Sequence, residues 1–164
     1  MAQVCLITTG QPSTNPRLMK EADALVEAGH QVEIIYAHWA DWADVTDQEM
    51  IKASPMTFTL VGGHPLLQRH RYRWTRLRHK FGRSISVYLS LEKLRHLALS
   101  RVTPDLCRAA RAQKADLYIA HNLGALPAAV QAAQKLGTKA GFDAEDFHSG
   151  SAFSNGTTRK ADAV

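Results

Sequence analysis

The chain opens with a strand, a loop, a helix and a second strand between Val4 and Ala37, and this order constrains its fold more than any other feature. Val4–Ile7 and Val32–Tyr36 are short apolar runs, as expected of strands buried on both faces. Two strands joined by a helix form a parallel βαβ unit, and the ligands of such sheets collect at the carboxyl ends of the strands. The loop Thr9–Asn15 follows the first strand directly, so we expect functional groups there.

The helix of this unit carries local signals at both of its ends. Asn15 stands where a helix N-cap belongs, and Pro16 fits the first helical position because its missing N–H would have no partner there. Gly29 fits the position just after the last turn. An apolar stripe at helical spacing predicts the face that packs on the sheet: Leu18, Ala22, Leu25 and Val26.

Three further strands are predicted downstream, at Thr57–Val61, Asp116–Ala120 and Lys139–Phe142. Helical segments separate them, so the alternation of strand and helix continues to the last strand. This alternation predicts an α/β fold with a Rossmann-like, doubly wound and mostly parallel sheet.

The later helices are placed by their breakers and caps. Two helical segments with a break at Gly82 are expected over Leu66–Arg101. The pair Thr103-Pro104 is expected to cap the next helix. Asn122 is expected to cap a helix that ends at Gly137.

The length of 164 residues suits one domain with a substantial core, which we place at residues 1–150. Residues 151–164 lose all periodicity and are expected to be a disordered or foreign tail. No leader precedes the first strand, and no apolar run approaches the roughly 20 residues of a membrane span. Cys5 and Cys107 are expected to be buried, reduced thiols, which indicates a cytoplasmic protein that is soluble or peripheral to a membrane.

The net charge of +5 hides an uneven distribution. Eight of the 15 acidic residues precede residue 50, and none lies between Ile51 and Leu91. Within that stretch, the segment Arg69–Arg83 holds seven lysines or arginines interleaved with aromatic residues. One surface of the domain should therefore be strongly positive.

A basic amphipathic helix of this kind suits an anionic membrane surface. Trp74, Leu77 and Phe81 share one helical face, while the arginines spread over the rest. The residues expected to contact the membrane are Arg71, Arg73, Trp74, Arg76 and Arg78. The alternative is a solvated basic face above an apolar stripe that packs on the core. No recognition motif supports nucleic-acid binding.

The loop after the first strand, TTGQPSTNPR, contains neither the glycine fingerprint of dinucleotide sites nor the Walker pattern of ATP sites. An NAD(P)-dependent enzyme is therefore disfavoured. The backbone N–H groups at the helix start still attract anions or hydroxyl oxygens, and Arg17 adds a cation. Alternatively, Asn15-Pro16 only starts the helix and Arg17 is a solvated charge.

Two further clusters follow the last two predicted strands. His121-Asn122 stands where a side chain meets a ligand, although a lone histidine is also a common structural residue. Residues 143–148 hold three carboxylates and an imidazole that could supply a general base, or else form a solvated acidic loop. Zinc is rejected because no cysteine or second histidine stands nearby at ligand spacing, and no metal site is predicted.

Two tryptophans follow the second strand. Trp39 and Trp42 are three positions apart and can share one face of a turn or short helix. We expect them to pack against the edge of the sheet rather than to stack on a sugar or a base.

Taken together, these segments resemble the N-terminal domain of a family 4 glycosyltransferase with the GT-B architecture. The most specific part is GQPSTNPRLMKEADALVEAGHQV, which is similar to the family's S-x-N-P-R, K-E-A and A-G-H-x-V pattern. WADWAD, LVGGHP, AHN and FDAEDFHSG match in order and spacing. The resemblance covers Val4–Gly150 and implies a retaining transferase, whose co-substrate is a nucleotide sugar and which needs no further cofactor.

The resemblance also implies roles for residues of the first loop and of the loop after the fourth strand. Gly10, Asn15 and Arg17 would face the acceptor and the donor phosphates, and would thus bind substrate. His121 would be a catalytic residue at the interdomain cleft, and Asn122 would bind substrate beside it.

The last cluster takes a catalytic role by the same resemblance. Glu145, Asp146 and His148 occupy the loop where the family places a cleft-facing histidine or carboxylate. This chain reads Glu-Asp-Phe-His, whereas the common form has the histidine directly before the glutamate.

Two hypotheses remain from the sequence. The first is the acceptor-binding half of a glycosyltransferase that acts on a glycan or lipid-linked acceptor. Its donor-binding C-terminal domain is expected to be missing, so the chain is expected to be truncated, or to work with a separate C-terminal half, and to be inactive alone. The second is a non-catalytic Rossmann-like module that docks on a membrane or a partner chain through its basic helix.

Overall fold

The structure, a computed structural model, describes residues 1–89 and 100–144. Its centre is a parallel sheet of five strands in the order β3-β2-β1-β4-β5. The strands are β1 (Gln3–Thr8), β2 (Gln31–Ala37), β3 (Thr57–Val61), β4 (Leu117–His121) and β5 (Lys139–Asp143). The predicted Rossmann-like α/β class is confirmed, and each predicted strand is present.

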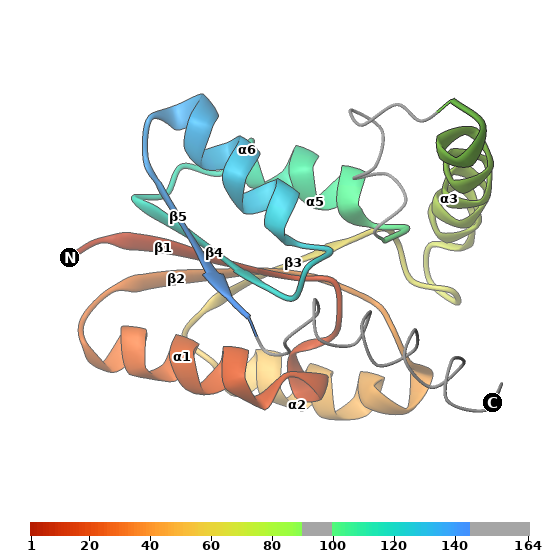
Figure 1. The fold of residues 1–164 in the computed structure, drawn as a ribbon. Helices are drawn as coiled ribbons and strands as arrows, with labels where there is room; N and C mark the ends of the chain where they lie inside the picture. Colours follow the sequence, from red (N-terminus) through yellow and green to blue (C-terminus); the bar gives the residue numbers. More distant parts are fainter. Residues whose placement is uncertain (90–99, 145–164) are drawn as a thin grey trace, which may run out of the picture.

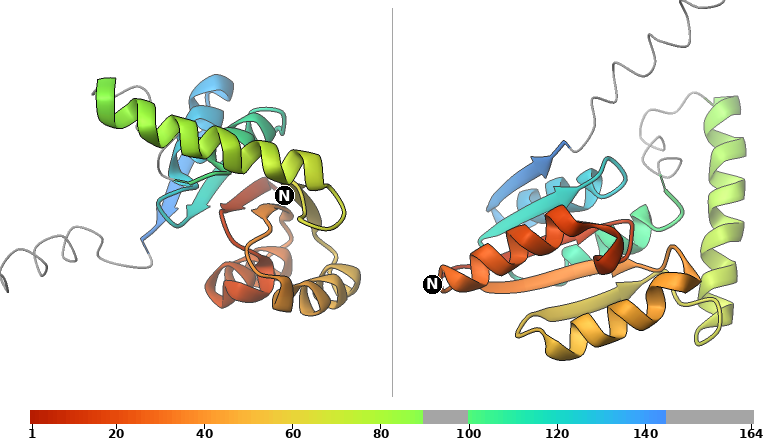
Figure 2. Two further views of the ribbon diagram at one scale, coloured as in Figure 1. Left: turned by 90° about the vertical axis from the view of Figure 1, so that its right-hand side faces the viewer. Right: turned by 90° about the horizontal axis from the view of Figure 1, so that it is seen from below.

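Helices cover both faces of the sheet, as a parallel sheet requires. Figure 1 shows α1 and α2 on one face, with α5 and α6 on the other. In both views of Figure 2, α3 stands across the carboxyl end of the sheet. The helices are α1 (Pro16–Glu27), α2 (Asp44–Ala53), α3 (Arg69–Leu89), α5 (Thr103–Ala110) and α6 (Leu126–Leu136), with short 3-10 turns η1 (Pro12–Thr14) and η2 (Asp41–Ala43).

Alternate residues of β1 supply the two halves of the core. Leu6 packs with Leu18 of α1 on one face, whereas Ile7 packs with Leu106 of α5 on the other. All four side chains are fully buried. This explains why the central strand reads as an unbroken apolar run rather than an alternating one.

Local signals correctly predicted the two ends of α1. The Asn15 side chain accepts a hydrogen bond from the backbone N–H of Leu18, at 3.1 Å, and Pro16 is the first helical residue. Gly29 follows the last turn with a φ of +82°, a left-handed conformation that glycine adopts without strain. The predicted stripe faces the sheet, with Leu18 and Ala22 fully buried.

Other helix boundaries differ from the prediction. Helix α3 continues through Gly82 to Leu89, because one glycine costs a helix only about 1 kcal/mol. Thr103 does not cap α5, since its hydroxyl donates to the Gly124 carbonyl at 2.8 Å. The helix α2 was not predicted at all. The start of the second segment expected after Gly82 therefore belongs to α3, and residues 90–99 and the tail at 151–164 lie outside the described residues.

For α6, the predicted start is wrong and the predicted end is right. Helix α6 begins at Leu126 after Ala125, so Asn122 does not cap it. Gly137 ends it in the left-handed conformation, with a φ of +69°.

Both cysteines are free and buried, as expected. Burial is the main cause that raises the pKa of the Cys5 and Cys107 thiols above its usual value. Both residues therefore pack as small apolar groups rather than act as nucleophiles.

Substitution of the α1 cap tests the hydrogen bond that starts this helix. Asn15→Ala should lower the free energy of unfolding by about 1 kcal/mol, because the Leu18 N–H loses its acceptor. Chemical denaturation of both proteins measures the loss. Asn15→Ser keeps an acceptor and should remain close to wild type; equal stability of the alanine variant and wild type would contradict the cap.

Candidate functional site

The sheet changes its winding direction between β1 and β4. Thr8 and His121 end these neighbouring strands and pair in register. From there the chain continues to α1 on one face and towards α6 on the other (Figure 1). A crevice at such a switch point is the usual ligand site of an open α/β sheet.

An open pocket of about 250 Å³ lies at this point. It is lined by Thr8, Thr9, Gly10, Thr14, Asn15, Trp39 and Asn122. We call these residues the switch-point pocket. The pocket brings together Gly10, Asn15 and Asn122, which are three of the four residues predicted to bind substrate. Its lining offers hydroxyl, amide and backbone groups and no ionised side chain.

Asn122 joins the two loops that form the pocket. Its side-chain Nδ2 donates to Thr8 Oγ1 at 3.0 Å, and its Oδ1 accepts from Thr9 Oγ1 at 3.0 Å. Its φ is +74°, a left-handed conformation that asparagine tolerates better than most residues. The backbone turn and both hydrogen bonds thus give Asn122 a bridging role at the end of β4.

Arg17, in the first turn of α1, and His121, at the end of β4, do not line this pocket. Arg17 forms a two-pronged ion pair with Asp143, with nitrogen–oxygen distances of 3.0 and 2.6 Å. His121 has no exposed surface, and its Nε2 lies 2.7 Å from Glu21 Oε2. Its Nδ1 lies 3.4 Å from Asp143 Oδ2. The structure therefore places these two predicted site residues in one charged network.

The same network borders a second, wider pocket of about 530 Å³. Its charged residues are Arg17, Lys20, Glu21 and Asp143, and Phe142 adds a partly exposed ring. The predicted catalytic residues Glu145, Asp146 and His148 lie outside the described residues, just after β5.

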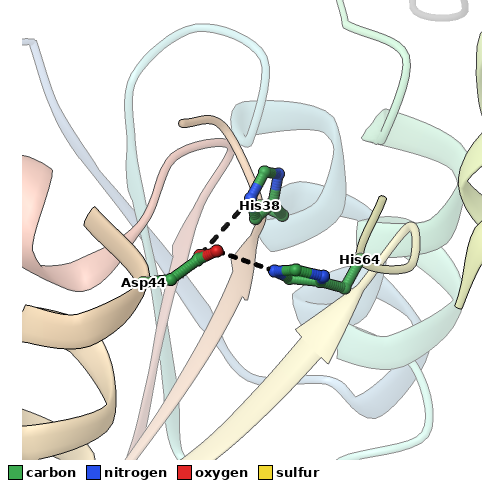
Figure 3. Close-up of side chains that lie close together, drawn as sticks. All are labelled: His38, Asp44 and His64. Atoms are coloured by element: carbon green, nitrogen blue, oxygen red, sulfur yellow. Dashed lines mark hydrogen bonds and ion pairs between the residues drawn. The ribbon is translucent and has the colours of Figure 1, made fainter. Parts of the chain in front are cut away.

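A third cluster lies where β2 and β3 end and was not predicted as a site. His38, Asp44 and His64 point toward one another in Figure 3. Asp44 Oδ1 lies 3.3 Å from His38 Nε2, and Asp44 Oδ2 lies 2.9 Å from His64 Nε2. The sequence places each histidine shortly after a predicted strand, but only the structure shows that these two strands are neighbours in the sheet.

Three groups of this kind could hold a metal ion, since their ligand atoms lie within 4.8 Å of one another. The hydrogen bonds of His64 argue against it. Its Nδ1 accepts from the backbone N–H groups of Leu66 and Leu67, at 3.1 and 3.3 Å, so the ring proton is on Nε2. Nε2 then donates to Asp44, whereas a metal would need its lone pair.

Asp44 belongs instead to a buried hydrogen-bond network around Gln11. The Gln11 amide donates to Asp44 at 3.0 Å and to Asp47 at 2.7 Å. Burial first, and then the charges of Asp47 and Asp44, raise the pKa of the nearby Tyr36 hydroxyl, which keeps that phenol neutral. Because Asp44 binds both Gln11 and His64, we interpret the cluster of His38, Asp44 and His64 as a structural one that connects the loops after β1 and β3 to α2.

The two tryptophans after β2 do not pack on the sheet, contrary to prediction. Trp39 is 68% exposed and Trp42 is 71% exposed. Trp39 forms one wall of the switch-point pocket. The backbone at Trp39 and Ala40 is bound to the buried Gln11 side chain, whereas the indole of Trp39 lies at the surface.

Helix α3 presents two different faces. Its inner face docks on the loop after β3 and on the segment before α5. Thr75 Oγ1 lies 3.4 Å from the Gly62 carbonyl oxygen and accepts from Arg101 at 3.2 Å, and the Arg101 guanidinium lies over the Tyr72 ring at 4.6 Å. Arg78 is held there by an ion pair with Asp105. The outer face exposes Trp74, Leu77 and Phe81 by 61%, 47% and 61%.

Arg71, Arg73 and Arg76 are exposed on the same helix. Four of the five residues predicted to contact a membrane are thus accessible, and Arg78 is occupied by Asp105. Within the described residues, no helix is long and apolar enough to cross a membrane.

Comparison with known proteins supports the fold. No family model matches the chain, and no curated protein matches it. The C-terminal domain of a hydrogenase from Pyrococcus furiosus is similar with a TM-score of 0.50 and 13% identity, over 87% of this chain and 90% of that one. The glycosyltransferase TcCGT1, solved in complex with UDP, is similar with a TM-score of 0.54 and 14% identity.

The likeness to TcCGT1 covers 86% of this chain and 28% of that protein. The five-stranded parallel sheet thus matches a Rossmann-like domain of a GT-B glycosyltransferase. At these identities both similarities show the fold alone, and neither identifies family 4.

The hydrogen bonds of His64 predict the response to zinc. Zn²⁺ added to the full chain should leave the melting temperature unchanged, because Nε2 of His64 carries a proton. A site saturated a hundredfold would stabilise the fold by about 2.7 kcal/mol, which a thermal melt detects. A rise with Zn²⁺ that disappears in Asp44→Asn would contradict this prediction.

Proposed function

We propose that this chain is the acceptor-binding half of a retaining glycosyltransferase. The enzyme would move a sugar from a nucleotide-sugar donor to a glycan or lipid-linked acceptor. A second Rossmann-like domain, on the same or a separate chain, would hold the donor. The observation that carries the proposal is the switch-point pocket, whose hydroxyl and amide lining suits the hydroxyl groups of an acceptor.

The proposal has further support from the fold and the sequence motifs. TcCGT1, which is similar in fold, was solved with UDP, and the ordered motifs resemble family 4 N-terminal domains. The network of Arg17, Glu21, His121 and Asp143 is next to the pocket in the chain, because Arg17 follows Asn15 by two residues and His121 directly precedes Asn122. In the complete enzyme, this network would lie beside the cleft and position groups of the second domain.

Catalysis would depend on the donor half, because rate enhancement requires both substrates to be held in a reactive geometry. The full chain alone should bind acceptor glycans and show no sugar transfer. A panel of nucleotide sugars and glycan acceptors, followed by product analysis, tests this. Multiple turnover by this chain alone would refute an acceptor half, and tight UDP binding without glycan binding would place the donor here.

The alternative function is docking on an anionic membrane through α3, which would hold the protein at the inner face of the membrane. The exposed Trp74, Leu77 and Phe81 favour it, since these side chains do not pack on the core. The inner face of the helix contacts the loop after β3 and α5, so the apolar outer face and the exposed Arg71, Arg73 and Arg76 remain available to a membrane.

Vesicle co-sedimentation of the full chain tests this surface. Changing Arg71, Arg73 and Arg76 to Gln should weaken binding to anionic vesicles at least tenfold, because each cation near such a surface contributes about 1 kcal/mol. Arg78 is not substituted in this variant, because it forms an ion pair with Asp105 that holds α3 in place.

A matched control removes the same charge elsewhere: Lys20, Lys114 and Lys139 changed to Gln, all exposed and away from α3. This control should bind nearly as wild type does. Equal losses in both variants would mean that only net charge matters, and equal binding to neutral and anionic vesicles would exclude an electrostatic membrane surface.

A further inference from the structure

We propose that the switch-point pocket binds one uncharged sugar ring, which stacks on Trp39. This inference rests on the proposed function and deepens it, because the ring would be the part of the acceptor glycan held at the reaction site. Three features of the pocket lead to it: the chemistry of its lining, the mounting of Trp39 and the pocket's size.

The lining offers no charged side chain to an ionic ligand, and an anion would meet just the backbone N–H groups at the start of α1. None of the seven lining residues carries a charge at neutral pH. The nearest cation of the first loop, Arg17, is paired with Asp143. A phosphate or nucleotide would leave its negative charge without a cationic partner, whereas sugar hydroxyls find donors and acceptors in Thr9 and Asn122.

The backbone that carries the Trp39 ring is fixed by hydrogen bonds to a buried side chain. Gln11 Oε1 accepts from the backbone N–H groups of Trp39 and Ala40, at 3.0 and 2.7 Å. Gln11 is itself 98% buried, since its exposed fraction is 2%, and it is held by Asp44 and Asp47. The indole is therefore exposed and yet fixed at its backbone, which reduces the entropy lost when a ligand packs on it.

An indole face beside hydroxyl and amide groups matches the two sides of a sugar ring. The C–H groups on one face of a pyranose are weakly positive and pack on the negative face of an aromatic ring. The hydroxyls at its rim reach polar partners. Exposure of an indole does not by itself indicate a sugar site, because Trp42 is as exposed as Trp39. Trp39 is selected because it lines the pocket, whereas Trp42 does not.

The size limits the occupant to a small unit. A volume of about 250 Å³ falls just below the roughly 300–1,000 Å³ of pockets that hold drug-sized ligands. It therefore suits one ring, with the rest of the glycan extending into solvent or towards the second domain.

NMR titration of the full chain tests the inference. The probes are the methyl glycosides of glucose, galactose, mannose and N-acetylglucosamine, with UMP as a charged comparison. The chain has three tryptophans, so three indole N–H signals report on it, and Trp39→Phe assigns the signal of Trp39. At least one methyl glycoside should shift the Trp39 signal in a saturable way, and UMP should not.

Two variants separate stacking from general effects. Trp39→Ala should weaken glycoside binding at least tenfold, and Trp39→Phe should weaken it less. Trp42→Ala is the matched control, because it removes an equally exposed indole that does not line the pocket, and its affinity should equal that of wild type. Thermal melts confirm that each variant is folded.

The possible failures are distinguishable. Glycoside binding that persists in Trp39→Ala, or that shifts only other signals, overturns the stacking inference and leaves the acceptor-binding proposal standing. UMP binding at Trp39 without glycoside binding makes the pocket a nucleotide site and overturns the inference. Absence of binding by every glycoside and longer glycan acceptor overturns both.

Discussion

The position of β1 in the middle of the parallel sheet is the constraint on which the rest of the structure depends. β1 pairs with β2 on one side and β4 on the other, so its residues are buried on both faces. Because the connections from β1 and β4 leave to opposite faces, the ends of these strands cannot be covered by either helix layer. The switch-point pocket exists because of this topology.

Gln11 gives that edge its rigidity. Its buried amide accepts two backbone N–H groups after β2 and donates to two carboxylates of α2, which joins three segments through one side chain. A buried amide with all these partners stabilises one loop arrangement, whereas the same amide without them would destabilise the fold. The position of Trp39 at the pocket is a consequence of this network.

Charge is divided among distinct surfaces of the domain. The switch-point pocket is uncharged, the region between α1 and β5 holds paired opposite charges, and the outer face of α3 carries exposed arginines. Ion pairs decide which cations remain accessible: Arg17 and Arg78 are bound to Asp143 and Asp105, whereas Arg71 and Arg73 extend to solvent. A net charge of +5 therefore indicates little about the chemistry of any one site.

The sequence by itself determined the elements whose signals are local. The strands, the cap at Asn15 and the stops at Gly29 and Gly137 follow from steric and hydrogen-bonding rules that act within a few residues. The alternation of these elements was enough to predict the fold class.

Only the tertiary structure decided how side chains with several possible partners are used. Asn122 bonds to Thr8 and Thr9, more than a hundred residues away, instead of capping the next helix. Arg17 pairs with Asp143 across a similar separation, and His38 meets His64 because their strands are neighbours. Such contacts depend on which elements lie side by side in the fold. A pattern within a few residues contains no information about which distant segments will be neighbours.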